Sequence, residues 1–392
     1  MGTYLNPDNS KFQESINSDI YVDKTGLITY TNSVIHTQQK CICVSRPRRF
    51  GKSMAANMLS AYYSRGCDSK ELFQNLEIAE DDQFETYLNQ YDVIFLNVQE
   101  FLSQSKNIDE MISLIRRSVL WDLLGEYPEF RYFDTSNLTR TMQDVYQQTK
   151  CPFVVIIDEW DCVFREYKTN RETQERYLDF LRDLLKDKGY IHLVYMTGIL
   201  PIKKYGTHSA LNMFDEFSMI EPGPLASYVG FTETEVQKLC GQYDMELEEV
   251  KNWYDGYSFD KALSVYSPRS VVSCMRLGKI GNYWNQTETF EALQVYIDMN
   301  FDGLKDDVLS MIAGNQVPVN IGSFTNDMTT FRSEDDVLTL LIHLGYLGYD
   351  SDNKAVFIPN GEIRSEYVKA VSVSDWGEVF GKTGTGRGIE MG

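Results

Sequence analysis

Two short polar motifs contain the residue types that bind and cleave a phosphoanhydride. The first is Gly51-Lys52-Ser53, in which a lysine and a hydroxyl follow a glycine. In a phosphate-binding loop, the lysine reaches the β and γ phosphates and the hydroxyl ligates Mg²⁺. The second is Asp158-Glu159, which follows the apolar run Val154–Ile157. The aspartate of such a pair can ligate Mg²⁺, and the glutamate can act as general base on the attacking water.

The phosphate loop needs a strand before it and a helix after it. We expect Cys41–Val44 to be a buried strand, Ser45–Gly51 a tight loop, and Ser53–Tyr63 a helix. The helix N-terminus and the loop N–H groups would then face the phosphates. In the motif GxxxxGK[ST], the first glycine is replaced here by arginine. We predict nucleotide contacts from Arg46, Pro47, Arg48, Arg49, Phe50, Gly51, Lys52, Ser53 and Met54.

The acidic motif ends an apolar segment, Phe153–Ile157, that is typical of a central parallel strand. Such a strand delivers its last residues to the edge of the sheet where ligands bind. We therefore predict a Mg²⁺ site made by Ser53 and Asp158. The predicted catalytic residues are Lys52, Glu159 and Thr197. Thr197 ends another strand-like run, where it would contact the γ-phosphate or the lytic water, or would only satisfy backbone groups.

The arginines leave two interpretations open. Those inside the loop would contact phosphate or present charge to a partner. A second group, Arg165, Arg171 and Arg176, follows the acidic strand and would act in trans on a neighbour's nucleotide. Because Glu166, Glu172 and Glu175 alternate with these arginines, a solvated helix face is the other interpretation.

Strands alternate with helices through the first ~230 residues, which indicates an α/β fold with a parallel sheet covered by helices on both faces. Thr232 with Glu235 forms a capping box, and Ser267-Pro268 marks a further helix start. We predict these parts: an N-terminal extension at 1–30, a P-loop ATPase domain at 31–229, a helical lid at 230–318, a winged-helix-like module at 319–371, and a disordered Gly-rich tail at 372–392. Gly381-Lys382-Thr383 has no strand or helix signal beside it, so we do not interpret it as a second phosphate loop.

Composition argues against several classes of protein. The 392 residues carry a net charge of −20, which would repel nucleic acid overall. No apolar run approaches the ~20 residues that span a bilayer, and the N-terminus lacks a secretory pattern. The seven cysteines are odd in number and include no CxxC pair, which indicates reduced thiols in a cytoplasmic protein.

The chain resembles the bacterial predicted AAA-ATPase family, of the AAA/ASCE type of P-loop NTPase, from about residue 10 to 370. The similar segments are YVDKT at 21–25, SRPRRFGKS at 45–53, IIDEWD at 156–161, TGILPI at 197–202, LNMF at 211–214, GFTETEV at 230–236, WYDGYSF at 253–259, VYSPRSV at 265–271, HLGYL at 343–347 and IPNGEIR at 358–364. The family carries RPRRFGK in place of a glycine-led loop, so the resemblance implies that Arg46 is a family trait. Trp160 replaces a frequent tyrosine.

Many members of that family continue into a PD-(D/E)xK nuclease-like domain. No such constellation is apparent in the last segment of this sequence, so we expect no nuclease activity from this chain and consider a truncated gene.

The resulting hypothesis is ATP binding with Mg²⁺-dependent hydrolysis, coupled to conformational change that acts on an unknown protein client, with a homo-oligomer as an option. Two alternatives remain open. One is a nucleotide-loaded switch or scaffold with negligible turnover. The other is a DNA-associated module that acts through the winged helix, which the net charge of −20 disfavours.

Overall fold

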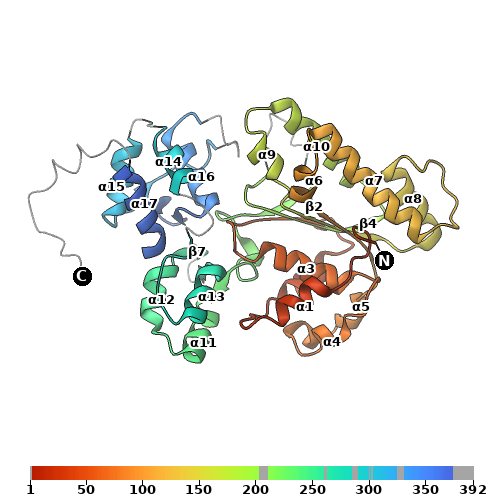
Figure 1. Cartoon of the computed structure of the whole chain (residues 1–392), viewed down its shortest axis with the longest axis horizontal. Helices are drawn as coiled ribbons and strands as arrows, with labels where there is room; N and C mark the ends of the chain where they lie inside the picture. Colours follow the sequence, from red (N-terminus) through yellow and green to blue (C-terminus); the bar gives the residue numbers. More distant parts are fainter. Residues whose placement is uncertain are drawn as a thin grey trace, which may run out of the picture. The chain divides into compact units, whose positions relative to one another are not determined.

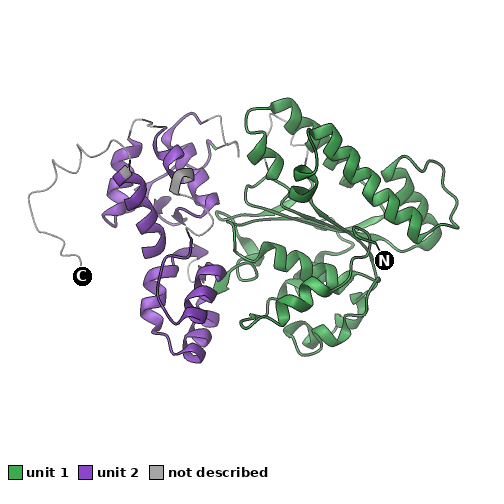
Figure 2. Cartoon of the chain, viewed as in Figure 1, with its two compact units in different colours: residues 1–231, 324–330 green, residues 232–323, 331–392 purple. Residues whose placement is uncertain are grey.

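The computed structural model describes residues 2–202, 211–259, 263–284, 290–299, 301, 303–324 and 331–373. The chain divides into two compact units, one of Met1–Phe231 with Phe324–Thr330 and one of Thr232–Ser323 with Phe331–Gly392 (Figure 2). Most of the predicted tail, and Gly381-Lys382-Thr383 within it, lies outside the described residues. The division of the second unit into a lid and a winged helix stays a prediction.

Within the described residues, the first unit is built on a five-stranded parallel sheet with the order β2-β3-β4-β1-β5. Its strands are β1 (Cys41–Ser45), β2 (Asp92–Asn97), β3 (Phe153–Asp158), β4 (Ile191–Gly198) and β5 (Asp215–Phe217). Every residue of β1 and β3 is buried, which is why both read as uninterrupted apolar runs. The predicted strands at 41–44 and 153–157 are confirmed, each with one further residue at its end.

Helices cover both faces of this sheet, as predicted (Figure 1). One face carries α3 (Lys52–Tyr63), which packs on β2, β3 and β4, and the other carries α6 (Val98–Ser103) on β3. The remaining helices of the unit are α1 (Ser10–Ile16), α2 (Gly26–Val34), α4 (Lys70–Phe73), α5 (Phe84–Tyr87), α7 (Ile108–Glu126), α8 (Leu138–Thr149), α9 (Cys162–Glu166) and α10 (Arg171–Leu185). Side-chain caps from Asn107 and Asn170 begin α7 and α10.

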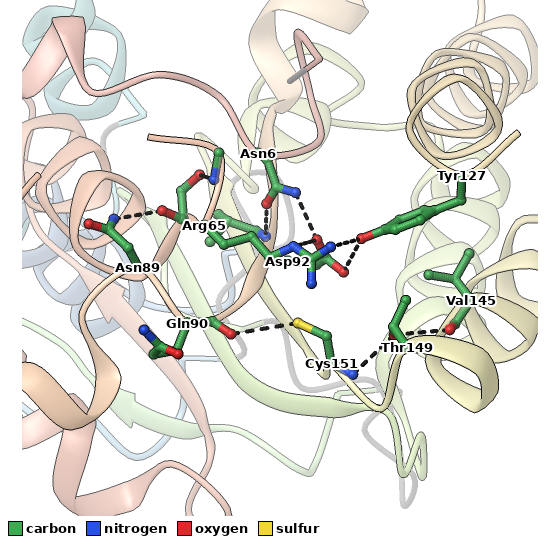
Figure 3. A network of polar contacts seen from close by, with 12 residues as sticks. Asn6, Arg65, Asn89, Gln90, Asp92, Tyr127, Val145, Thr149 and Cys151 are labelled. Carbon is green, nitrogen blue, oxygen red and sulfur yellow. Dashed lines mark hydrogen bonds and ion pairs between the residues drawn. The ribbon is translucent and has the colours of Figure 1, made fainter. Parts of the chain in front are cut away.

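The N-terminal segment covers the outer edge of β2. Leu5 pairs antiparallel with Ile94, and the Asn6 N–H donates to the carbonyl of Val93 at 2.7 Å. At the start of β2, the fully buried Asp92 accepts hydrogen bonds from Asn6 and Tyr127 (Figure 3). The edge strand is therefore shielded from pairing with another chain.

The second unit is mainly helical. The short strand β6 (Phe231–Thr232) lies at the point in the sequence where the first unit ends and the second begins. The helices of the second unit are α11 (Glu233–Tyr243), α12 (Leu247–Tyr254), α13 (Pro268–Leu277), α14 (Phe290–Ile297), α15 (Leu304–Ile312), α16 (Glu334–Leu344) and α17 (Gly361–Val373). β7 (Tyr257–Phe259) pairs antiparallel with β8 (Leu263–Tyr266), while β9 (Val317–Pro318), β10 (Gly348–Asp350) and β11 (Ala355–Phe357) form an antiparallel sheet. The capping box of Thr232 and Glu235 is confirmed, with both of its hydrogen bonds present.

Among the helices of the described residues, none has both the length and the apolar character that a membrane crossing needs.

Candidate functional site

The two chemical motifs lie at the same edge of the parallel sheet. The register pairs Asp158 of β3 with Thr197 of β4, and Thr197 in turn with Val44 of β1. The phosphate loop leaves β1 directly after Ser45, so the loop, the hydroxyl of Thr197 and the acidic pair all lie at the carboxyl ends of adjacent strands. This is the edge at which open α/β sheets bind ligands.

The loop between β1 and α3 contains two residues with a left-handed backbone. Arg49 and Gly51 have positive φ angles of 68° and 91°. Gly51 precedes the first residue of α3, and no atom lies within 4 Å of the position that a Cβ would take there. The left-handed backbone, rather than crowding, therefore explains why glycine suits this position. Pro47 and Phe50 are buried, whereas Arg48 and Met54 are exposed and Arg49 is half-buried.

Lys52 begins α3 and folds back across the loop, where its Nζ donates to the carbonyl oxygen of Pro47 at 2.9 Å. The side chain is almost fully buried, and burial lowers its pKa; the nearby carboxylates of Glu159, Asp161 and Asp158 oppose that shift. The ammonium is thus held by a neutral carbonyl oxygen, whereas an anionic phosphate oxygen would make the stronger, charge-assisted bond. This position suits a phosphate ligand.

Arg46, at the position of the missing glycine, has a fully buried side chain. Its Nη1 lies 2.9 Å from the carbonyl oxygens of Ser45, Phe217 and Ser218, and its backbone N–H donates to Gly198 at 3.1 Å. Burial lowers the pKa of the guanidinium to about 10, which still leaves it charged at neutral pH. These bonds connect the start of the loop to the end of β5. Direct contact of Arg46 with phosphate stays a prediction.

Asp158 and Ser53 provide oxygen atoms side by side. The Asp158 carboxylate is almost fully buried, and burial raises its pKa, whereas the hydrogen bond with the Ser53 side chain opposes the shift. Its Oδ1 also accepts the backbone N–H of Glu159 at 3.0 Å. Carboxylate and hydroxyl oxygens are ligands that Mg²⁺ favours, so the two side chains fit the ion that the sequence predicts.

Glu159 has a left-handed backbone, with φ of 54°, directly after the strand. A non-glycine residue in this region stores strain, which occurs frequently at functional sites. Its carboxylate is partly exposed and forms an ion pair with Arg165 of α9. Sequence reasoning placed Arg165 on a solvated face or in a neighbour's site, but the structure turns it toward its own acidic pair.

Asp161 is a site residue that sequence reasoning missed. It is fully buried, its Oδ2 accepts the Leu200 N–H at 3.0 Å, and the same oxygen lies 3.3 Å from Nε of Arg165. The spacing of an aspartate four residues before an arginine was the available signal, since such residues meet on one helix face.

Thr197 has a buried hydroxyl that finds no hydrogen-bond partner within the part of the chain that the structure describes. Its carbonyl accepts the N–H of Trp160 at 3.1 Å. At the next residue, Gly198, a Cβ would lie 2.6 Å from both Asp161 Oδ1 and Trp160 Cδ1, so a side chain is excluded. A buried hydroxyl without a partner costs free energy, which is the pattern expected of a group that meets a ligand.

Comparison with known proteins identifies the family of the chain. The family model described as "Predicted AAA-ATPase" matches residues 9–207, a segment that contains the loop, the acidic pair and Thr197. The chain belongs to this family. A relative from Azotobacter chroococcum mcd 1, an uncharacterized protein in the vnfD 5′ region, is 22% identical over 280 residues, which are 69% of this chain and 51% of the relative. The chain therefore spans about half the length of that curated relative.

Solved structures resemble the predicted AAA-ATPase chain only loosely. The ORC2 protein of Aeropyrum pernix, in ADPNP-ADP complexes, aligns with a TM-score of 0.34 and 12% identity over 94% of this chain and 99% of its own. Cdc6p of Pyrobaculum aerophilum aligns with a TM-score of 0.31 and 10% identity, over 94% of this chain and 99% of its own. The ORC1 protein of Aeropyrum pernix in complex with DNA aligns with a TM-score of 0.30 and 10% identity, over 97% of this chain and 100% of its own. At these scores nothing further about this chain follows.

Proposed function

We propose that this predicted AAA-ATPase hydrolyses ATP in a Mg²⁺-dependent reaction and couples hydrolysis to conformational change. The observation that carries the proposal is the shared sheet edge, where Lys52, Ser53 and Asp158 lie beside the general-base candidate Glu159 and the unpartnered Thr197 hydroxyl. The family membership supports nucleotide binding at this edge.

The triphosphate would bind at the N-terminus of α3, a helix of 12 residues whose first N–H groups have no carbonyl partner within the helix. Lys52 would exchange the Pro47 carbonyl for the β and γ phosphates. Ser53 and Asp158 would hold Mg²⁺, which when bound neutralises charge on the phosphate oxygens. The exposed Met54 in the first turn of α3 offers apolar surface for the rest of the nucleotide.

Hydrolysis would proceed by in-line attack of water on the γ-phosphorus. A new bond forms between the water oxygen and phosphorus, while the bond from phosphorus to the bridging oxygen breaks and leaves its electron pair on ADP. Glu159 orients the water and accepts its proton, which then passes to solvent. Thr197 donates a hydrogen bond to the γ-phosphate or to the water.

Hydrolysis would drive a movement of the second unit, and this movement would act on a protein client in the cytoplasm. The chain would do this work alone or as part of a homo-oligomer.

One observation favours the alternative of a nucleotide-loaded switch with negligible turnover. Glu159 is paired with Arg165, so one oxygen of the candidate base is already occupied by a cation.

Steady-state phosphate release tests the proposal. We expect multiple turnovers from the wild type and losses of about 100-fold or more in Lys52→Ala and Glu159→Gln. Matched controls are Lys70→Ala and Glu175→Gln, whose side chains are 58% and 50% exposed in surface ion pairs. Both should retain wild-type activity. Tight retention of ATP without phosphate release would support the switch and contradict the enzyme.

A further inference from the structure

Arg165 lies in the candidate site of its own chain. Its side chain is 14% exposed, in contrast to the 73% of Arg171 one helix later. It forms ion pairs with both Glu159 and Asp161, and these carboxylates outweigh burial and raise its pKa. A cation that is buried between two acids is not free to reach a neighbouring subunit. A role in its own site fits this geometry better than a role in trans.

Asp161 fixes one side of this guanidinium. Its Oδ2 accepts the Leu200 N–H and also forms an ion pair with Arg165 at 3.3 Å from Nε, so the arginine lies against the segment that follows β4. The other side of the guanidinium contacts the partly exposed Glu159 through Nη2. The arginine thus lies between a fully buried carboxylate and a carboxylate that is 22% exposed.

The pairing occupies Oε2 of Glu159, which is one of the two atoms that could orient a water. A second anion at this place would compete for the guanidinium. Arg165 pairs with Glu159, the residue after Asp158, so its guanidinium lies at the sheet edge where the acidic pair ends β3. Its charge also acts on Lys52, the residue proposed to bind phosphate. A guanidinium forms strong paired hydrogen bonds with phosphate oxygens as well as with carboxylates.

Provided that the site binds ATP as proposed above, we infer that Arg165 is a positioning residue with two alternative partners. Without a γ-phosphate it pairs with Glu159 and keeps that carboxylate from the water position. With ATP bound, the γ-phosphate takes the guanidinium and frees Glu159. The exchange makes the site sensitive to the third phosphate, and it would separate an idle state from a hydrolytic one without a residue from another subunit.

A double-mutant cycle on binding tests the exchange. The affinities of a non-hydrolysable ATP analogue and of ADP are measured, with Mg²⁺ present, for wild type, Glu159→Gln, Arg165→Gln and the double variant. Glu159→Gln removes the competing carboxylate, so the analogue should bind about ten-fold tighter while ADP changes less than about two-fold. Arg165→Gln should lose the preference for the analogue over ADP. The double variant should bind both nucleotides with the same affinities as Arg165→Gln.

Several outcomes would overturn the inference. If the gain from Glu159→Gln persists in the double variant, it reflects general repulsion, and the exchange does not occur. An unchanged ratio of analogue to ADP affinity in Arg165→Gln has the same meaning. If Lys52→Ala leaves both affinities unaltered, the proposed function fails, and the inference fails with it. If Lys52→Ala weakens binding but the effects of Glu159→Gln and Arg165→Gln are additive, the inference fails and the proposed function stands.

Arg171→Gln is the matched control, because Arg171 also pairs with a glutamate but on an exposed face of α10. It should change neither affinity. Thermal unfolding of each variant establishes that it is folded. If Arg165→Gln fails to fold, Arg165→Lys replaces it in the cycle, since the lysine keeps the charge but not the paired geometry. The coupling should then shrink by at least about three-fold, and full coupling would contradict the proposal.

Discussion

The two ends of the parallel sheet contain buried carboxylates in opposite circumstances. At the amino end, Asp92 accepts hydrogen bonds from Asn6 and Tyr127 at 2.7 Å and pairs with Arg65 at 3.0 Å (Figure 3). At the carboxyl end, Asp161 Oδ1 and Thr197 Oγ1 are buried and lack a hydrogen-bond partner among the residues that the structure describes.

The difference separates stability from function. A buried polar group that has all its partners stabilises the fold, and one that lacks them costs free energy. The amino end connects the N-terminal segment, the edge strand and α7 into one network. The carboxyl end holds two polar atoms, Asp161 Oδ1 and Thr197 Oγ1, without a hydrogen-bond partner among the described residues, and a ligand site can keep polar atoms in this state. Mutations at the two ends should therefore affect different measurements.

The largest effect is expected from Asp158→Asn at the carboxyl end. Turnover should fall by about 100- to 1,000-fold, because a Mg²⁺ ligand and a negative charge are lost. The melting temperature should not fall, since burial raises the pKa of Asp158 and so disfavours its charged form. Phosphate-release assays and thermal unfolding check both parts. Asp179→Asn, a side chain 60% exposed in a surface ion pair, is the control. A variant that unfolds but keeps its turnover per folded molecule would remove the distinction between the two ends.

Asp92→Ala at the amino end should give the reverse result. Removing the carboxylate leaves Arg65, Asn6 and Tyr127 without their common partner, and the free energy of unfolding should drop by about 3 kcal/mol. ADP affinity per folded molecule should stay the same. Urea unfolding and equilibrium binding are the measurements. Asp109→Ala, whose side chain is 66% exposed, should cost less than about 0.5 kcal/mol. Lost affinity without lost stability would contradict the structural role.

Thr197→Val tests the role of a single buried hydroxyl at the carboxyl end of the sheet. The hydroxyl has no partner in the described structure, so the isosteric change should leave stability equal or raise it by up to about 1 kcal/mol. Turnover should fall about ten-fold.

The matched variant is Thr141→Val, since that buried hydroxyl donates to the Asp134 carbonyl at 3.1 Å. It should lose about 1 kcal/mol and keep its activity. Equal behaviour of the two threonine variants would show that Thr197 has no role with a ligand.

The smallest effect concerns pH and the amino end, where His192, the second residue of β4, lies beside His36. Burial, with help from the charges of His36 and Lys40, lowers the pKa of His192 to about 4, below the ~6.5 of an unfolded chain. A lowered pKa means that stability is present above about pH 6.5 and is lost as the pH falls toward 4. His192→Gln should reduce this loss by less than about 1 kcal/mol, because the ring is partly exposed. Unfolding curves between pH 4 and 7 check the slope, and an unaltered slope would exclude His192 as its source.

Much of the first unit was predictable from local sequence. β1, β3 and β4 are apolar runs because they are buried on both faces, and α3 follows a glycine in the left-handed region. Strand β5 was missed, as were β7 and β8, because three or four residues give too short a pattern for periodicity to detect. The seven cysteines are free thiols, of which Cys67 and Cys151 are only partly buried.

The sequence alone determined which residue types could bind phosphate and magnesium, since Lys52, Ser53, Asp158 and Glu159 stand in motifs whose chemistry depends on neighbours in the chain. Tertiary structure alone decided what the arginines contact. Arg46 meets carbonyls of residues 217 and 218, and Arg165 meets Glu159 and Asp161 of its own chain. A guanidinium is charged in any setting, so its role depends on which acceptors the packing of distant segments brings within reach.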